Sequence, residues 1–582
     1  MILKIILFLL SLTFLELNRN TILGWIAAIV LFIIYFYLSR TYAKNIFHGF
    51  LFLLGYLLVF ALIVYISWPP IRNVPAVTNK NPQKTEVYNT AYGQVQGVLN
   101  KDESVEVFAG IPFAKPPIGQ LRWKAPEDPE SWDGVLFADH FAPMSMQETS
   151  PPIYDSLTQI IGYHDYKISL DDNYRPPVSE DSLYLNIWKP ADASEKLPVM
   201  VYIHGGSLES GQPWYADYNG EKMASKGMIF VTITYRLGVF GFYGDEQLCK
   251  ESGNITTGNY GFLDMIKALE WVKENIDVFG GDPDNITVAG ESAGSAAVSA
   301  LCTSPLASGL FERVILESST LDSPKPPHSY RSYEQTLEAG KKTRENYGVN
   351  SIEELRLIPA EELVKQVSLH HHITVDGYSL LEDPYLSYKK GIHNEKAILH
   401  GYNSEESGPF ILFSKTTLKN YEEKISRYFG DYTGRVLEIF DAKTDEEAAK
   451  YWAQIYGDVF FTYSHYCLNR LANENGIPVY EYFFSKNNGR LGSWHSGEEI
   501  YAYDNIPASS KLFDEKDRNL SKLMSSYWYE FALKGDPNVQ GLETWPINKD
   551  NETLLELGEE VRITNERSQK LYDIMDEMYG WK

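Results

Sequence analysis

Three apolar runs in the first 68 residues constrain the fold of this chain more than any other feature. They cover residues 5–15, 22–38 and 46–68. The third run has 23 residues without Asp, Glu, Lys or Arg, enough to cross about 30 Å of hydrocarbon at about 1.5 Å per residue. The second run has 17 residues and is marginal. The first run spans a membrane only if Lys4 and Glu16 turn outward toward the interface.

A cleaved signal peptide followed by buried helices is the alternative interpretation of these runs. No small-residue cleavage site follows the first run, and signal peptides do not carry two further spans. We therefore predict a multi-pass membrane anchor of two or three helices within residues 1–68, with Trp25, Tyr35 and Tyr37 as interfacial anchors.

Charge is divided unevenly between this region and the remaining chain. The whole sequence has 52 Lys and Arg against 77 Asp and Glu, a net charge of −25. Residues 1–72 contain five bases and one acid, so residues 73–582 carry 47 bases and 76 acids, a net charge of −29. An acidic surface of this kind excludes a protein that tracks nucleic-acid phosphates, because such proteins need basic surface.

The basic residues around the apolar runs bear on membrane orientation. Arg40 and Lys44 favour a cytoplasmic loop between the second and third runs, which puts the rest of the chain outside the cytoplasm. Arg72, Lys80 and Lys84 follow the third run and act in the opposite direction. Charge alone leaves the two orientations nearly balanced, and we expect an extracytoplasmic catalytic domain.

Beyond the apolar runs, the sequence alternates between strand and helix patterns. Residues 69–84 hold four prolines without apolar periodicity, which predicts an extended linker. In the rest, residues 85–582, buried strands are expected at LPVMVYIHGG, GMIFVTITYR and NITVAG, with a helix over residues 259–278. Continuous apolar strands alternating with helices predict an α/β fold with a mostly parallel sheet covered on both faces.

The central motif is Gly290-x-Ser292-x-Gly294, which follows an expected strand and opens an expected helix. Glycines two residues before and after the serine relieve crowding in a sharp strand-to-helix turn and expose the serine Oγ. The dipole of the following helix favours negative charge at its N-terminus. The motif by itself is weak, and a turn with a buried serine is the alternative.

A second glycine-rich turn, His204-Gly-Gly-Ser207, ends an upstream strand. It lets backbone N–H groups approach a carbonyl oxygen and form part of an oxyanion hole. A tight turn that needs positive φ is the alternative interpretation, and both can hold together. A serine nucleophile also needs a general base later in the chain; the candidates are His328, His370, His371, His372, His393, His400, His465 and His495.

His495 stands out among these because it lies in the turn GSWHSG, followed by Glu498 and Glu499. The triple histidine, residues 370–372, has no acidic or cysteine companions at metal-ligand spacing. The chain has three cysteines and no paired Cys motif, so we predict no disulfide scaffold, no metal and no cofactor.

Residues from about 88 to 580 resemble the type-B carboxylesterase family, the cholinesterase and carboxylesterase branch of the α/β-hydrolases. The matching motifs appear in the family's order across nearly 500 residues. They are FAGIPFAKPPIGQLR (108–122), SEDSLYLN (179–186), GNYGFLD (258–264), FGGDP (279–283), GYNSEE (401–406) and WHSGE (494–498). The resemblance implies an α/β-hydrolase fold over residues 85–582.

The resemblance also implies roles for single residues. Ser292 matches the nucleophile, His495 the general base and Glu406 the acid that orients the base, with Glu405 as the alternative acid. The order Ser, Glu, His along the chain is the one expected of α/β-hydrolases. Gly206, Ser207 and Ala293 match the three N–H donors of the oxyanion hole, and Arg122 and Glu180 match a structural ion pair.

This sequence departs from the family pattern at two places. Ser207 stands where Gly or Ala is usual; its backbone N–H is retained, but its hydroxyl either narrows the acyl side or adds a donor. Ser145 and Ser182 stand at the two positions of the family's early disulfide, so we expect that loop to be held by packing alone.

We therefore predict a membrane-anchored serine carboxylesterase that acts on small-molecule esters through an acyl-enzyme intermediate. A lipid-directed lipase or sterol esterase is the alternative among enzymes. A catalytically inert adhesion protein of the same fold is the alternative from another class, although such proteins usually lack a triad residue. The sequence does not define the acyl or alcohol group of the substrate, or the oligomeric state.

Overall fold

The computed structural model describes residues 1–161, 174–193, 195–253, 255–326, 330–487, 492–549, 551 and 553–581. The chain forms two compact units. The first contains Met1–Val74, Glu148–Pro177 and Pro507–Leu512, and the second contains Pro75–Gln147, Val178–Ile506 and Phe513–Lys582. The expected linker, residues 69–84, is therefore divided between the units at Val74 and Pro75.

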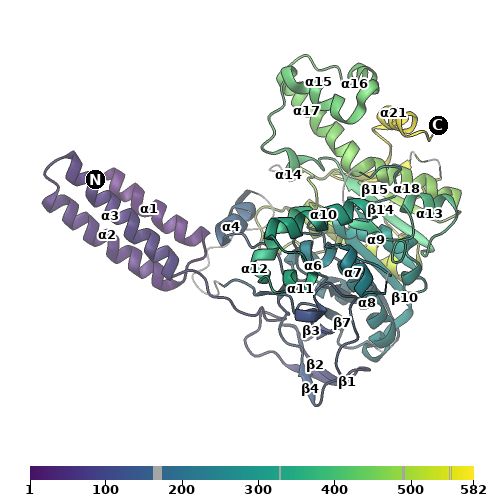
Figure 1. Cartoon of the computed structure of the whole chain (residues 1–582), viewed down its shortest axis with the longest axis horizontal. Helices are drawn as coiled ribbons and strands as arrows, with labels where there is room; N and C mark the ends of the chain where they lie inside the picture. The colour runs from purple at the N-terminus through teal and green to yellow at the C-terminus, as the bar shows by residue number, and fades with distance from the viewer. Residues whose placement is uncertain are drawn as a thin grey trace. The chain divides into compact units, whose positions relative to one another are not determined.

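The first unit contains three long apolar helices that lie side by side (Figure 1). They are α1 (Ile2–Leu17), α2 (Ile22–Tyr42) and α3 (Ile46–Ile66), and a shorter helix, α4 (Pro152–Ile161), packs against α1. By length and composition α2 and α3, with 21 residues each, can cross a membrane. At about 1.5 Å per residue, the 16 residues of α1 span about 24 Å, less than the hydrocarbon thickness.

Polar side chains join these helices to one another, which the sequence did not indicate. Lys4 Nζ donates to Ser39 Oγ at 2.6 Å, and Ser11 Oγ lies 2.8 Å from the Tyr56 hydroxyl. The condition under which the first run spans a membrane, that Lys4 and Glu16 turn outward, is not met here, because Lys4 bonds α2 and Glu16 is 8% exposed. Tyr35, expected at the interface, is also buried, with its ring centroid 4.9 Å from that of Tyr56.

The second unit is built on one large sheet. In spatial order its strands are β1 (Lys84–Asn89), β2 (Gln94–Leu99), β3 (Val105–Pro112), β7 (Tyr184–Pro190), β9 (Ile229–Ile233), β8 (Leu197–Ile203), β10 (Gly281–Glu291), β11 (Arg313–Glu317), β14 (Ala397–Asn403), β15 (Val479–Phe484), β16 (Thr553–Leu557) and β17 (Val561–Asn565), and β4 (Val135–Phe137) pairs with β2. In this spatial order, each strand from β9 to β16 is parallel to the next. At the two ends of the sheet, β1 pairs with β2 and β16 pairs with β17 in antiparallel fashion. Small separate pairs join β5 (Met144–Ser145) to β6 (Val178–Ser179) and β12 (Tyr330–Ser332) to β13 (Ile373–Val375).

Helices surround this sheet (Figure 1). They are α5 (Glu221–Ser225), α6 (Gly238–Phe242), α7 (Glu246–Glu251), α8 (Tyr260–Asn275), α9 (Ala293–Thr303), α10 (Tyr333–Tyr347), α11 (Ile352–Arg356), α12 (Ala360–Leu363), α13 (Pro384–Lys389), α14 (Gly408–Ile411), α15 (Leu418–Phe429), α16 (Thr433–Ile439), α17 (Asp445–Gly457), α18 (Tyr463–Glu474), α19 (Glu499–Ala502), α20 (Glu515–Lys534) and α21 (Gln569–Tyr579). A π-helical turn, Asp458–Thr462, joins α17 to α18. Helices α15 to α18 share an apolar cluster with α21.

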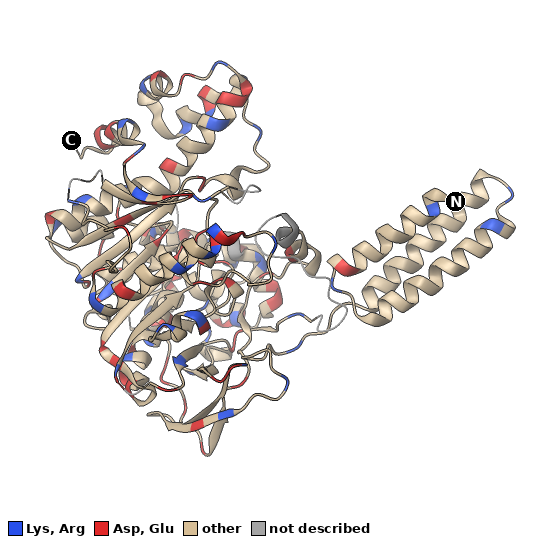
Figure 2. Cartoon of the chain, turned by 180° about the vertical axis from the view of Figure 1, so that it is seen from behind, with Lys and Arg blue, Asp and Glu red and all other residues tan. Residues whose placement is uncertain are grey.

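The predicted α/β class with a mostly parallel sheet is confirmed. The apolar strands of this sheet are buried on both faces. Strand β9 is buried at every position, and β8 at every position except its first residue. Helix α8 buries Leu263, Ile266, Leu269 and Val272, and most of its other positions are buried too. Charged residues cover the second unit, whereas the helices of the first carry few (Figure 2).

The loop between the two missing cysteine positions is held by hydrogen bonds, so the expectation of packing alone is wrong. Ser145 Oγ lies 3.0 Å from Ser182 Oγ and donates to the Tyr235 carbonyl oxygen at 2.7 Å. All three cysteines are free. The expected structural ion pair is also present, with Arg122 Nη2 2.5 Å from Glu180 Oε1.

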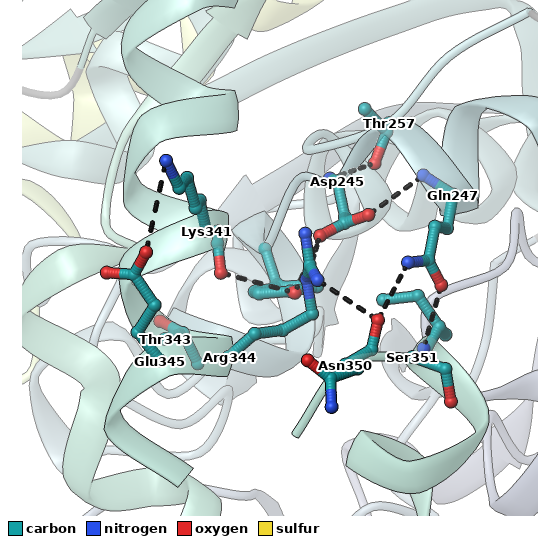
Figure 3. Close-up of polar contacts among 12 residues, drawn as sticks. Asp245, Gln247, Thr257, Lys341, Thr343, Arg344, Glu345, Asn350 and Ser351 are labelled. Carbon is teal, nitrogen blue, oxygen red and sulfur yellow. Dashed lines mark hydrogen bonds and ion pairs between the residues drawn. The ribbon is translucent and has the colours of Figure 1, made fainter. Parts of the chain in front are cut away.

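A polar network fastens α7, α10 and α11 together (Figure 3). Asp245 accepts hydrogen bonds from Arg344 Nε at 2.7 Å and from the Gln247 backbone N–H at 2.8 Å. Arg344 and the Gln247 side chain both donate to the Asn350 carbonyl oxygen. The Asp245 side chain is only 2% exposed, so its charge is compensated mainly by Arg344.

Arg344→Met is expected to destabilise the protein because it leaves the buried Asp245 carboxylate without its cationic partner. Breaking a fully buried pair costs about 3–5 kcal/mol, and we expect about 2 kcal/mol here because Arg344 is 23% exposed. Thermal unfolding in detergent measures the change. The matched control is Arg427→Met, which removes an exposed pair with Glu423 and should cost about 0–1 kcal/mol. Equal effects of the two variants would contradict the prediction.

Candidate active site

Ser292 lies at the turn between β10 and α9, with φ 53° and ψ −124°. Gly290 and Gly294, two residues before and after Ser292, let neighbouring backbone atoms approach closely. A Cβ on Gly294 would lie 2.1 Å from the Ile203 carbonyl oxygen, and one on Gly290 would lie 2.7 Å from the Gly294 carbonyl carbon. The predicted strand, sharp turn and helix are all present, and side chains at either glycine position would collide with backbone.

The structure brings three of the predicted site residues into one hydrogen-bonded chain. His495 Nε2 lies 2.8 Å from Ser292 Oγ, and His495 Nδ1 lies 2.6 Å from Glu406 Oε2. The other carboxylate oxygen of Glu406 accepts from the Asn403 backbone N–H at 2.8 Å. His495 is 6% exposed and Glu406 1% exposed. In this arrangement Ser292 donates to Nε2 while the Nδ1–H donates to the carboxylate.

Two loops supply the acid and the histidine. Glu406 follows β14, the His495 loop follows β15, and these strands are parallel neighbours. The Glu405 backbone N–H donates to the Ser493 carbonyl oxygen at 3.0 Å, which joins the loops. Glu405, the alternative acid, is exposed and lies against Gly492 rather than against the His495 ring.

The second glycine-rich turn lies directly beside the serine. A Cβ on Gly205 would lie 3.0 Å from Ser292 Cβ, and one on Gly206, whose φ is 103°, would lie 2.2 Å from the Ser210 carbonyl oxygen. Within the described residues, the backbone N–H groups of Gly206, Ser207 and Ala293 donate to no protein carbonyl. These donors are therefore available to an oxyanion.

Two aromatic residues at the site were missed by sequence reasoning. The rings of Phe461 and Phe410 lie 4.6 Å and 5.2 Å from the His495 ring, measured between centroids. Phe461 belongs to the π-helical turn and Phe410 to α14, two residues beyond Gly408. Together they form an apolar wall on the His495 ring. In the sequence, the one signal for these residues was the position of Phe410, four residues after the predicted acid Glu406.

A cluster of buried carboxyl groups lies around the histidine and the serine. Burial raises the pKa of Glu291, Glu498 and Glu499, and carboxyl neighbours raise it further. Burial and Glu498 raise the pKa of Glu317 to about 8. A pKa of about 8 leaves Glu317 mostly protonated at pH 7. Each accepts a hydrogen bond from a hydroxyl: Glu291 from Ser496, Glu317 from Tyr503, Glu498 from Ser318 and Glu499 from Tyr202.

The remaining candidate histidines lie elsewhere. His328 falls outside the described residues. His370, His400 and His465 are buried in the core, where burial lowers the pKa of each, to about 3 for His400. His371 and His393 face Glu209 and Glu395. Across the described residues, no three His, Cys, Asp or Glu side chains converge as metal ligands.

Comparisons with known proteins agree with this architecture. Residues 84–575 match the carboxylesterase family. The fumonisin B1 esterase of Sphingopyxis macrogoltabida is 33% identical over 82% of this chain and 87% of that esterase, and carboxylesterase 1C of Rattus norvegicus is 32% identical over 84% and 92%. The solved structure of a Geobacillus stearothermophilus carboxylesterase is 30% identical, covers 84% of this chain and 99% of its own, and superposes with a TM-score of 0.71.

The fold is thus that of the α/β-hydrolase esterases, and the resemblance seen in the sequence is confirmed. The chain belongs to the carboxylesterase family. It is a carboxylic ester hydrolase that acts on small-molecule esters. The family match begins at residue 84, so the three apolar helices of the first unit lie outside it.

Glu317→Gln is expected to reduce the pH dependence of stability. The Glu317 pKa rises from an ordinary 4.5 in the unfolded chain to about 8 in the folded one, so the folded state holds a proton that the unfolded state releases. Stability should therefore fall as pH rises from about 5 to 8, by at most about 1.4 kcal/mol per pH unit from this group. Thermal unfolding across this range checks it. Exposed Glu353→Gln is the control, and an unchanged slope in Glu317→Gln would contradict the prediction.

Proposed function

We propose that this carboxylesterase uses a Ser292–His495–Glu406 triad and an acyl-enzyme intermediate. The observation that carries the proposal is the hydrogen-bonded chain from Ser292 Oγ through both ring nitrogens of His495 to Glu406, at 2.8 Å and 2.6 Å. A serine hydroxyl is a weak nucleophile unless an adjacent base removes its proton, and the base needs a third group to hold its tautomer.

The first half of the reaction forms the acyl-enzyme. Ser292 Oγ attacks the ester carbonyl carbon while its proton passes to His495 Nε2. The negative carbonyl oxygen of the tetrahedral intermediate accepts from the N–H groups of Gly206, Ser207 and Ala293, each worth about 3–4 kcal/mol in comparable sites. The intermediate collapses, the bond to the alcohol oxygen breaks, and the alcohol leaves with the proton from His495.

The second half reverses these roles with water. His495 takes a proton from water as the hydroxide attacks the acyl carbonyl carbon. The second tetrahedral intermediate expels Ser292 Oγ, which regains the proton, and the carboxylic acid departs. Glu406 accepts from the Nδ1–H of His495 and stabilises the imidazolium in both halves. Glu291 lies 3.4 Å from His495 Nε2, and its raised pKa disfavours a second negative charge beside the ring.

The domain organisation belongs to the same proposal. Residues 1–68 form a multi-pass transmembrane anchor, residues 69–84 a linker and residues 85–582 the catalytic domain. Helices α2 and α3 have the length and hydropathy required. The Lys4–Ser39 hydrogen bond brings the N-terminus to the end of the helices that carries Arg40 and Lys44. Basic residues gathered at this end favour the cytoplasm there and an extracytoplasmic catalytic domain.

A lipid-directed lipase or sterol esterase is a second candidate, and the apolar helices α2 and α3 favour it over a purely water-soluble esterase. A rate series over p-nitrophenyl esters from acetate to palmitate separates the two. Rates that rise steeply with acyl length, or that appear only on micelles, identify the lipase. An inert adhesion protein is disfavoured because the Ser, His and Glu positions are all occupied.

Ser292→Ala is expected to abolish ester hydrolysis and covalent labelling by a fluorophosphonate probe, because the nucleophile is lost while the fold is kept. Hydrolysis of p-nitrophenyl acetate and the labelling yield measure both losses. Circular dichroism and thermal unfolding serve as the folding control. Full activity or full labelling in the variant would overturn the assignment of the nucleophile.

Glu406→Gln and Glu405→Gln together test which acid orients the histidine. The Glu406 variant should lower kcat by about 10³–10⁴-fold, because the neutral amide neither fixes the tautomer nor stabilises the imidazolium. The Glu405 variant is the matched control, one residue away, and should retain kcat within about twofold, because its side chain is exposed. The reverse order of effects would assign the orienting role to Glu405.

A further inference from the structure

The turn that carries His495 holds a serine in a backbone conformation that favours glycine. The Gly497 backbone N–H donates to the Trp494 carbonyl oxygen at 2.8 Å, so His495 and Ser496 are the two central residues of a β-turn. Ser496 has a φ of 68°. Positive φ at the second central position is typical of a type II turn, in which glycine or asparagine is usual because a larger side chain is strained there. Strained residues of this kind cluster at functional sites.

The hydroxyl of Ser496 bonds the carboxyl group of the residue that precedes the candidate nucleophile. Ser496 Oγ donates to Glu291 Oε1 at 2.5 Å. The Glu291 side chain is 4% exposed, and it lies against the second glycine-rich turn, since a Cβ on Gly205 would lie 2.6 Å from Glu291 Oε2. The hydrogen bond thus links the histidine loop to the end of β10 through a hydroxyl that glycine lacks.

The same carboxyl oxygen lies close to the ring nitrogen that moves the proton in the proposed mechanism. Glu291 Oε1 is 3.4 Å from His495 Nε2, whereas Ser292 Oγ is 2.8 Å from that nitrogen. Hydrogen bonds between nitrogen and oxygen fall between about 2.7 and 3.2 Å, so Ser292 is within bonding range and Glu291 is just outside it. Once Nε2 carries the proton, a shift of only about 0.3 Å would let Glu291 accept from it in place of the leaving alcohol.

We propose that Ser496 is a positioning residue: its hydroxyl holds the Glu291 carboxyl away from His495 Nε2 and so reserves the Nε2 proton for the leaving alcohol. The inference rests on the proposed triad. A carboxyl oxygen that already accepts a short hydrogen bond from Ser496 is fixed in place, and it accepts from a second donor less readily. Glycine at this position relieves the backbone strain but leaves Glu291 free to bond the ring.

Other titratable groups face the same pair of side chains. Burial raises the pKa of Glu291, neighbouring carboxyl groups raise it further, and the Ser496 hydrogen bond lowers it. The groups that face Glu291 are the carboxyls of Glu499, Glu498 and Glu406, the phenols of Tyr202 and Tyr235, and the His495 ring, whose other nitrogen bonds Glu406. A protonated ring therefore has several acceptors around it, and the position of each acceptor decides where the proton goes.

Steady-state kinetics of Ser496→Gly in the full-length protein test the proposal. With p-nitrophenyl acetate at pH 7, kcat should fall about fivefold and KM should change less than about twofold, because the hydroxyl acts on proton transfer and not on substrate binding. The acid limb of the kcat/KM profile should move to higher pH by about 0.5 unit, because Glu291 then stabilises the protonated ring and catalysis needs the neutral ring. An unchanged kcat with an unchanged profile would overturn the proposal.

The same substitution in a Glu291→Gln background shows whether Ser496 acts through Glu291. A neutral amide oxygen competes weakly for the proton, so adding Ser496→Gly there should change kcat by less than about 1.5-fold. Where turnover is slow, the rate of labelling by a fluorophosphonate probe replaces kcat. An equal fivefold loss in both backgrounds would overturn the proposal, because the hydroxyl would then act independently of Glu291.

Two further variants serve as controls. Glu103→Gly replaces another residue of positive φ, 61°, at an exposed position of the second unit, and should change neither kcat nor the pH profile. Ser496→Gly should unfold within about 2 °C of the wild type, because relief of strain offsets the lost hydrogen bond, and a larger fall would overturn the proposal by making the loss structural.

His495→Ala separates this inference from the proposed triad. Its kcat should fall by at least about 10³-fold. Full activity in this variant would overturn the triad, whereas a large loss here together with unchanged kinetics in Ser496→Gly would overturn the role of Ser496 alone.

Discussion

The left-handed backbone of Ser292 is the constraint on which the rest of the site depends. A non-glycine residue held there costs about 1–3 kcal/mol and persists only where its surroundings fix it. Parallel pairing of Gly290 with both neighbouring strands fixes the approach to the turn, and the Ser292 N–H donates to the Glu317 carbonyl oxygen at 2.9 Å. Gly294 then lets α9 begin against the Ile203 carbonyl oxygen. The strand pairing and this hydrogen bond therefore offset the backbone strain at Ser292. The strained turn presents the Ser292 Oγ to the His495 ring.

The carboxyl groups around that ring raise an electrostatic problem, which their raised pKa values reduce. Two ionised carboxylates about 4 Å apart repel by roughly 4 kcal/mol near a protein surface, and by more in the interior. Burial raises the pKa of Glu291 and Glu498, which disfavours the ionised form of both groups. In the proposed mechanism Glu406 is the carboxyl group that hydrogen-bonds the imidazolium. A site with every carboxylate ionised would hold the proton on His495 too tightly to release it to the leaving alcohol.

Most of the fold could be predicted from sequence because it depends on local pattern, whereas the roles proposed for His495 and Glu406 came from the family resemblance. Continuous apolar strands and glycines at fixed offsets determine β10, Ser292 and α9 with little reference to distant residues. Side-chain contacts between distant segments could not be predicted. The Ser145–Ser182 hydrogen bond spans 37 residues, and Phe461, which contacts the His495 ring, lies in the π-helical turn between α17 and α18. Composition likewise gave no sign that Lys4 bonds another helix.

The charge distribution explains why apolar helices, rather than basic residues, would hold this enzyme at a membrane. Residues 73–582 carry a net charge of −29, and anionic lipid headgroups repel such a surface while each basic residue gains only about 1 kcal/mol near it. The negative charge of the protein would therefore oppose electrostatic attachment to the membrane surface. In the proposed anchor, helices α2 and α3 would avoid this conflict, because burial of apolar side chains in lipid is independent of lipid charge.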